Sequence, residues 1–465
     1  MSIRTVPNYR KLKVAELTHP CPEAGGRSRT RQPRGRLDRW MILRDLLADA
    51  WANPGIDRGE LVDRHLGSLS PLEADLIRRM FLNVERIFHV QGAEIDLEGA
   101  SIAFDDDRAG VTTSVHVTFR VTHADGSVEM VRLKTGRSSS SPQEAAVMWS
   151  GAEEAETFTD LMAWPGEVEE VPAPSDLEQV LRALVEEAPA LRTSGVRPGP
   201  ACVWCARAAL CGAFPTDRIV PSSARTINLT KTDVEGLVQC RRRVAWRRVH
   251  GIPRDDGDDD ASPAVSQGRL FHALVAAAEG SDTPADTVSD FLLGVAPSEV
   301  ADMRMMWEHH RHLMDAEGIG ARRLEFPVGL TILEGERADI HGVTIIGFLD
   351  MTARDAAGRP VAVEIKTGSP GDTEIEDDLY AVGLRRWIGP DDPIMIHRHY
   401  VRPSPPVCEI VELEPGVADL ATERLRRRVA VVNGWDWEDP LAVAPSVGPW
   451  CGGCEFRLTC ESYRA

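Results

Sequence analysis

The stretches that decide the fold are VTIIGFLDMTA at 343–353 and VAVEIKT at 361–367. Both are dominated by apolar residues, and a run of turn-type residues joins them, so we expect a hairpin in the interior of a sheet. Asp350 ends the apolar run of the first strand. Glu364 and Lys366 lie two apart on the second, so their side chains project from one face. Charged residues on buried strands indicate a functional site.

Two carboxylates at the ends of adjacent strands form a hard oxygen-ligand site of the kind that binds Mg²⁺ or Mn²⁺. Lys366 beside them can polarise an attacking water and offset charge on a phosphoryl oxygen. Phosphodiester hydrolysis needs these contributions. The alternative is that Glu-x-Lys is only the polar side of a half-exposed strand, which is the usual case for an isolated example of this pattern.

The chain repeats itself. The spacing Cys-x2-Cys-x5-Cys occurs at 201–211 (ACVWCARAALC) and at 450–460 (WCGGCEFRLTC), and a helical pattern precedes each triplet. VRLKTG at 131–136 likewise mirrors VEIKTG at 363–368. We therefore predict two copies of one domain, residues 1–215 and 216–465.

The first copy lacks the carboxylates. Alignment of the two Lys-Thr-Gly motifs places Thr118 at the position of Asp350 and Arg132 at that of Glu364, while Lys134 matches Lys366. No counterpart of GRLFH (268–272) is found in the first copy. Without anionic ligands this copy is predicted to be catalytically silent, with a structural or binding role.

The second copy resembles the RecB-like branch of the PD-(D/E)xK nuclease superfamily, which includes the RecB and AddB nuclease domains and CRISPR-associated exonucleases. The resemblance is carried by GRLFH at 268–272, GFLD at 347–350 and EIKTG at 364–368. It implies an α/β fold with a restriction-endonuclease-like mixed sheet flanked by helices, here as a tandem duplication with a degenerate first copy.

The resemblance also implies roles for single residues. His272, Asp350, Glu364 and the carbonyl of Ile365 would ligate the metal, and Lys366 would be the catalytic lysine. The family's next helix reads Gln-x-x-x-Tyr. Here it is EDDLY (376–380), so Tyr380 remains while Glu376 replaces the glutamine, and the role of that position is left open.

Six of the nine cysteines lie in the two triplets, a spacing that favours metal or cluster ligation over disulfides. Four thiolates suit either Zn²⁺ or a 4Fe-4S cluster. The iron-sulfur subset of the family has one cysteine before the nuclease core and three after it, which implies a cluster with zinc as the alternative. The matching residues are Cys240, Cys451, Cys454 and Cys460. A second cluster would use Cys202, Cys205 and Cys211 with Cys21, whose surroundings match less well.

A net charge of −19 argues against broad coating of nucleic acid but leaves room for a local basic groove. Arginines after Cys240 and on the late helix could line such a channel, with Trp246 available for stacking; solvated helix faces are the alternative. The sequence shows no apolar run long enough for a membrane span and no signal peptide, so we expect a cytoplasmic protein with no membrane partner.

Two functions compete at this point. The first is a deoxyribonuclease that uses Mg²⁺ or Mn²⁺, an exonuclease on single-stranded DNA or DNA ends, in repair, recombination or defence. The second is a non-catalytic iron-sulfur subunit that binds DNA within a helicase-nuclease or defence complex. No Walker A loop is present, so any unwinding would require a separate helicase. The intact carboxylates beside a degraded copy favour the first.

Overall fold

The structure is a computed structural model of the whole chain. It describes all residues except 1–9, 18–20, 22–33, 90–92, 98, 137, 152–153, 187, 189–198, 206–207, 211–212, 217–224, 256–262, 321–322, 335–340, 369, 372, 390–391 and 465. Cys211 therefore lies outside the described residues. None of the helices in the described part is both long and apolar enough to cross a membrane.

The chain forms two compact units that do not follow the order of the sequence. Unit 1 contains residues 1–197, 241–257 and 436–465, and unit 2 contains 198–240 and 258–435. The segment with the second cysteine triplet thus belongs to unit 1, and the segment with the first belongs to unit 2. These units do not test the duplication predicted from the sequence. The duplication is a correspondence between two segments of sequence, whereas the units are defined by compactness.

Unit 2 is built on a six-stranded mixed sheet. Its strands are β9 (Arg225–Thr230), β10 (Arg323–Glu334), β11 (His341–Arg354), β12 (Pro360–Lys366), β13 (Ile394–Tyr400) and β14 (Val407–Leu413). Their order is β10-β11-β12-β13-β14, and β9 pairs with β11. Strands β9 and β11, and β12 and β13, run parallel, while the other pairs are antiparallel. The expected hairpin is β11 and β12, and β12 lies inside the sheet.

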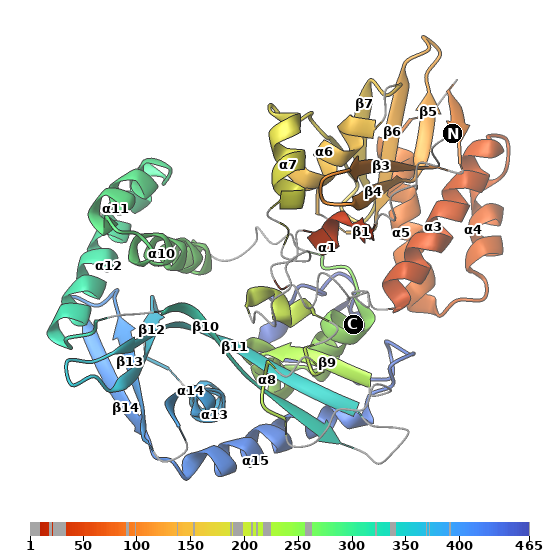
Figure 1. Cartoon of the computed structure of the whole chain (residues 1–465). Helices are drawn as coiled ribbons and strands as arrows, with labels where there is room; N and C mark the ends of the chain where they lie inside the picture. Colours follow the sequence, from red (N-terminus) through yellow and green to blue (C-terminus); the bar gives the residue numbers. More distant parts are fainter. Residues whose placement is uncertain are drawn as a thin grey trace, which may run out of the picture. The chain divides into compact units, whose positions relative to one another are not determined.

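Helices cover both faces of this sheet (Figure 1), so the predicted α/β fold with a mixed sheet flanked by helices is confirmed. The helices of unit 2 are α8 (Lys231–Gln239), α10 (Pro263–Glu279), α11 (Pro284–Leu293), α12 (Pro297–Ala316), α13 (Glu374–Gly383), α14 (Arg385–Ile388) and α15 (Val417–Val429). Phe271 and Met306, from α10 and α12, share an apolar core with Val363 and Ile365 of β12. Helix α13 packs on the opposite face, so closely that a Cβ on Gly347 would lie 2.6 Å from Leu379.

Unit 1 has two sheets. The first has the order β1-β4-β3 and the second β2-β5-β6-β7-β8. The strands are β1 (Arg10–Lys13), β2 (Glu94–Asp96), β3 (Ala100–Asp106), β4 (Val111–Val117), β5 (Phe119–Thr122), β6 (Val128–Lys134), β7 (Thr157–Met162) and β8 (Glu167–Glu170). The helices are α1 (Val14–Leu17), α3 (Arg34–Ala52), α4 (Arg58–Leu66), α5 (Pro71–Ile87), α6 (Pro142–Gly151), α7 (Leu177–Glu186), α9 (Arg241–Ala245), a π-helix (Trp246–His250) and α16 (Glu461–Arg464).

The two units share a strand pattern. Strand β6 pairs antiparallel with β5 and parallel with β7, as β12 does with β11 and β13. Strand β1 pairs parallel with β4, as β9 does with β11. Helices α6 and α13 follow β6 and β12 along the chain, and α7 and α15 follow the last strand of each half. The two units therefore share this order of strands and helices, and the duplication itself stays a prediction.

Both cysteine triplets begin with the same short turn. The amide of Gly199 donates to Sγ of Cys202 at 3.4 Å, and the amide of Gly448 donates to Sγ of Cys451 at 3.4 Å. Each turn is a 3-10 helix, Pro200–Trp204 in unit 2 and Pro449–Cys451 in unit 1. The repeat detected in the sequence is thus also a repeat of backbone geometry.

Candidate active site

The two carboxylates of the hairpin lie on adjacent strands in the interior of unit 2. Asp350, on β11, accepts a hydrogen bond at Oδ2 from the backbone amide of Ile365, on β12, at 2.7 Å. Glu364, on β12, is buried. The antiparallel pairing of β11 and β12 brings these positions together although they are 14 residues apart in the chain.

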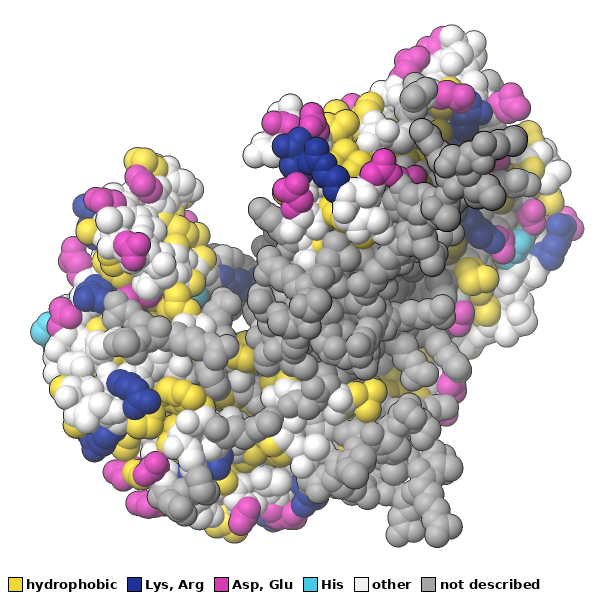
Figure 2. Space-filling view, in the orientation of Figure 1, with side chains coloured by type: hydrophobic (Ala, Val, Ile, Leu, Met, Phe, Trp, Pro, Cys, Tyr) yellow, Lys and Arg dark blue, Asp and Glu magenta, His cyan; other side chains and the backbone are white. Residues whose placement is uncertain are grey.

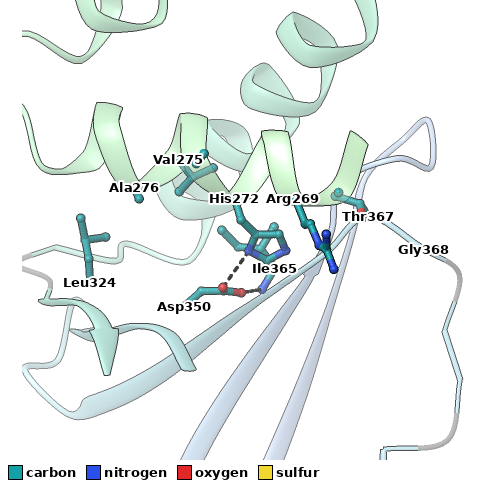
Figure 3. A pocket seen from close by; sticks show the side chains of 11 residues that line it. Arg269, His272, Val275, Ala276, Leu324, Asp350, Ile365, Thr367 and Gly368 are labelled. Atoms are coloured by element: carbon teal, nitrogen blue, oxygen red, sulfur yellow. Dashed lines mark hydrogen bonds and ion pairs between the residues drawn. The ribbon is translucent and has the colours of Figure 1, made fainter. Parts of the chain in front are cut away.

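His272 joins this pair from helix α10. Its Nδ1 lies 2.8 Å from Oδ1 of Asp350, and Figure 3 shows the imidazole ring extending from α10 toward that carboxylate. Helix α10 reaches β12 closely because Gly268 has no side chain; a Cβ there would lie 2.9 Å from Oγ1 of Thr367. With Nδ1 bound to Asp350, the other ring nitrogen is the one able to ligate a metal.

Lys366 connects Glu364 to helix α13. Its Nζ lies 2.8 Å from Oε1 of Glu364 and 2.7 Å from Oε1 of Glu376. The hydroxyl of Tyr380 donates to Oε2 of Glu364 at 2.7 Å, and Lys231 pairs with the second oxygen of Glu376 at 3.1 Å. The structure therefore brings together all of the residues that the sequence singled out for this site.

The pKa shifts at the site follow from burial and from the excess of carboxylates. Burial, and then the charge of Asp350, raise the pKa of Glu364 well above its usual range. Burial also opposes the charge on Glu376, but hydrogen bonding with Glu364 and the charges of Lys366 and Lys231 outweigh it and lower that pKa to about 2. Burial lowers the pKa of Lys366, but the two glutamates outweigh burial and raise it, so the ammonium stays charged.

A cavity of about 690 Å³ opens beside Asp350. Its lining comes from α10, from Leu324 of β10, and from the end of β12 with the loop that follows. The lining residues are Gly268, Arg269, His272, Ala273, Val275, Ala276, Leu324, Asp350, Ile365, Thr367 and Gly368. Arg269 projects beside His272 at this cavity (Figure 3) and is exposed, so its guanidinium is available to an anionic ligand.

Unit 1 fills the equivalent site with its own side chains. The hydroxyl of Thr118 accepts from the amide of Leu133 at 3.0 Å, as Asp350 does from Ile365. The carbonyl of Leu133, equivalent to that of Ile365, accepts from Nε1 of Trp40 on α3 at 2.8 Å. This contact between an indole and the carbonyl was not predictable from the sequence.

The charges of the unit 1 site are paired with one another. Arg132 pairs with Glu144 at 3.1 Å, and Lys134 pairs with the fully buried Asp160 at 2.9 Å. Arg132 lies opposite Asp160 in the sheet, just as Glu364 lies opposite Arg398, so the signs of this cross-strand pair are exchanged between the units.

Most arginines of the channel suggested by the sequence form ion pairs, and the stacking role suggested for Trp246 is wrong. Trp246 is buried, with its Nε1 donating to the carbonyl of Pro440, so it cannot stack on a nucleobase. The arginines engaged in ion pairs and their partners are Arg242 with Glu461, Arg243 and Arg247 with Glu455, Arg424 with Asp378, Arg426 and Arg427 with Glu423, and Arg428 with Glu374. On the face drawn in Figure 2, the described basic side chains are interspersed with acidic ones.

Sequence reasoning missed three parts of this arrangement. Glu376 was noted only as a departure from a family motif, yet it is buried and holds Lys366. Its mirror position, Glu144, could have signalled a repeated glutamate. Lys231 and Trp40 lie far away in the sequence and carried no signal.

The comparisons with known proteins cover most of unit 2 and the two segments of unit 1 at 241–257 and 436–461. The family profile of the PD-(D/E)XK nuclease superfamily matches residues 228–461, half of the chain. The chain belongs to this superfamily, which makes it a nuclease by family. None of the curated proteins matches it.

Two solved structures resemble the chain in part. One is a proposed exonuclease from Eubacterium rectale, with 13% identity and a TM-score of 0.31, covering 51% of this chain and 87% of its own. The other, the protein SSO0001, has 13% identity and a TM-score of 0.22, and covers 53% of this chain and 89% of its own.

Proposed function

We propose that this chain is a divalent-metal-dependent deoxyribonuclease that hydrolyses phosphodiester bonds at the site in unit 2. The observation that carries the proposal is the clustering of Asp350, Glu364, His272 and Lys366, in which His272 and Asp350 also line an open cavity. The corresponding residues of unit 1 lack both carboxylates.

The donor set fits Mg²⁺ or Mn²⁺. Carboxylate oxygens of Asp350 and Glu364, the carbonyl of Ile365 and an imidazole nitrogen of His272 would hold the ion. The raised pKa of Glu364 supports this assignment, because burial and then the charge of Asp350 raise it, and a cation would stabilise the charged carboxylate against both. When bound, the metal would polarise a phosphoryl oxygen and lower the pKa of a bound water.

Lys366 acts in this proposal as a fixed cation rather than as a base. Its pKa is raised, so it remains protonated and can hold a water molecule or a phosphoryl oxygen by hydrogen bonds. Tyr380 and Glu376 are positioning residues, since both bind the Glu364–Lys366 pair from α13. Arg269 would contact a substrate phosphate at the cavity mouth.

The substrate we propose is single-stranded DNA or a DNA end, degraded exonucleolytically in repair, recombination or defence, with a helicase or defence-complex subunit as partner. These finer assignments rest on the resemblance of GRLFH, GFLD and EIKTG to RecB-like nucleases, which process such ends. The alternative, a non-catalytic DNA-binding subunit, leaves the buried Glu364–Lys366–Glu376 arrangement without a role.

We also propose a 4Fe-4S cluster on Cys240, Cys451, Cys454 and Cys460, with zinc as the alternative, and a second site on Cys202, Cys205, Cys211 and Cys21. The matched turns support thiolate ligation, because an amide aimed at Sγ stabilises a thiolate sulfur. Iron and acid-labile sulfide analysis of anaerobically purified protein distinguishes cluster from zinc.

The test of catalysis is Mn²⁺-dependent degradation of end-labelled single-stranded DNA by the full chain and by Lys366→Ala. We expect activity in the wild type, release of short products from the ends, and a loss of about 10³-fold in the variant. A circular plasmid strand that is cut equally well would overturn the exonuclease assignment. Equal rates for both proteins, or none in either, would overturn the nuclease.

A further inference from the structure

A second group of metal-ligating side chains lies in unit 2, away from the carboxylates. His397 and His399 are two apart on β13 and share a face of the sheet, and Cys408 of β14 lies directly opposite His399 in the antiparallel register. In the pairing of β13 with β12, His399 lies beside Ile365, whereas Arg398 lies beside Glu364. The two histidines therefore occupy the face opposite Glu364.

The donor atoms of these three residues lie within 4.8 Å of one another. His399 is fully buried and His397 is 4% exposed, so neither imidazole has ready access to water. Nε2 of His399 and Nδ1 of His397 are buried without a hydrogen-bond partner among the described residues. Buried polar atoms are normally satisfied, and two orphaned nitrogens beside a thiol need an explanation.

A contact behind His399 engages one of its two ring nitrogens. Nδ1 of His399 lies 3.4 Å from Nδ1 of His310, on α12. Nε2 of His310 in turn faces Oε1 of Glu279 at 3.4 Å, without a hydrogen bond. The ring nitrogen of His399 that remains for a metal is therefore Nε2. A neighbouring polar group commonly holds the second nitrogen of a histidine metal ligand in this way.

We propose that His397, His399 and Cys408 bind a transition-metal ion of the zinc class, independently of the carboxylate site. Zinc–nitrogen distances of about 2.0–2.1 Å and zinc–sulfur distances of about 2.3 Å place tetrahedral donors roughly 3.3–3.6 Å apart, so small side-chain rotations close the site. Glu317, whose Oε2 lies 3.8 Å from Nδ1 of His397, supplies a carboxylate for the fourth position.

The two metal sites differ in their donors. Imidazole and thiolate select zinc, cobalt or copper over magnesium, whereas carboxylates and a carbonyl suit magnesium or manganese. The proposed ion has a structural role. It ties the half-exposed edge strand β14 to β13. The other face of β13 carries Arg398, which pairs with Asp377, the neighbour of Glu376 in the chain.

Cobalt(II) is the probe, because a cobalt–thiolate bond gives a near-ultraviolet charge-transfer band and tetrahedral cobalt gives visible bands. Full-length protein is treated with a chelator under anaerobic conditions and titrated with Co²⁺. Other cysteines also bind cobalt, so the informative quantity is the difference between wild type and Cys408→Ser. Cys408 lies on an edge strand, so the serine is expected to leave the fold intact, as circular dichroism checks.

We expect Cys408→Ser to bind one Co²⁺ fewer per chain and to lose the corresponding thiolate band, while the matched control Cys451→Ser/Cys454→Ser keeps that band. Zn²⁺ should displace the ion and raise the Tm of the wild type and of the control, but not of Cys408→Ser. His399→Gln should behave as Cys408→Ser does. Identical stoichiometry and spectra in wild type and Cys408→Ser would overturn the site, whatever the outcome for the histidine variant.

Discussion

The β12–α13 region of unit 2 and the β6–α6 region of unit 1 share one arrangement of strand and helix but carry different side chains at the equivalent positions. In unit 1 Lys134 is held by Asp160 and Arg132 by Glu144, and the carbonyl of Leu133 is taken by Trp40. In unit 2 Ile365, the residue equivalent to Leu133, borders an open cavity together with Asp350 and His272. One framework covers this position with an indole, and the other leaves it open to a ligand.

The pKa shifts express the same difference. Burial raises the pKa of Glu144, but Arg132 outweighs it and the pKa is lowered, whereas burial and neighbouring carboxylates raise that of Glu364. Burial lowers the pKa of Lys134, while two glutamates raise that of Lys366. The acidic and basic side chains of the unit 1 site balance one another without a metal. The unit 2 site has more acidic side chains than its lysines neutralise.

The largest expected contrast is in metal binding by Glu364→Gln and its matched control Arg132→Gln. Glu364→Gln removes an anionic ligand and should weaken Mn²⁺ binding by at least about 100-fold, abolishing the rise in Tm that Mn²⁺ gives the wild type. Arg132→Gln should retain that rise. Calorimetric titration gives the affinities, and equal affinity in both variants would erase the distinction between the two frameworks.

A smaller effect is expected from Glu376→Gln, which restores the glutamine of the family motif. The charge of Glu376 raises the pKa of Glu364, so its removal lets Glu364 ionise at lower pH. Because metal must displace a proton from Glu364, Mn²⁺ binding should extend to lower pH by about one unit. Glu144→Gln is the control and should leave this pH profile in place.

The free energies of unfolding of the wild type and of Glu376→Gln should also respond differently to acid. The pKa of Glu376 is about 2 against an ordinary value of 4.5, so its contribution is present above pH 4.5 and is lost as the pH falls toward 2. Glu376→Gln should lack the part of the acid-induced loss of stability that comes from protonation of Glu376.

For the binding prediction, a pH profile of Mn²⁺ binding that is the same in Glu376→Gln and in the wild type would mean that Glu376 does not couple to Glu364.

The sequence predicted the central hairpin and the clustering of Asp350, Glu364 and Lys366 because both are local patterns. Asp350, Glu364 and Lys366 lie on two successive strands, and alternation on a strand fixes which side chains share a face. The partition into units was not predictable, because Trp246 and Phe456 join the core of unit 1 through contacts distant in sequence. Trp40 was missed for the same reason, since its indole meets a backbone carbonyl 93 residues away.

The smallest effect tests whether Thr118 is a structural remnant of the aspartate position. Thr118→Val removes the acceptor for the buried amide of Leu133 and should lower the free energy of unfolding of unit 1 by about 1–2 kcal/mol. Thr118→Ser keeps the acceptor and should cost less. Urea unfolding measures both, and a larger loss in Thr118→Ser than in Thr118→Val would show that methyl packing matters at this position rather than the hydrogen bond.

The segments that form unit 1 are completed late in synthesis of the chain. Its core contains Phe456 and Trp246, and its segments end with residues 436–465. A ribosome that has made the whole of 1–435 has supplied every residue of unit 2 but has not completed unit 1. Unit 1 can therefore complete its core only after residues 436–465 have been made, and a chain that stops at residue 435 lacks part of unit 1 but no part of unit 2.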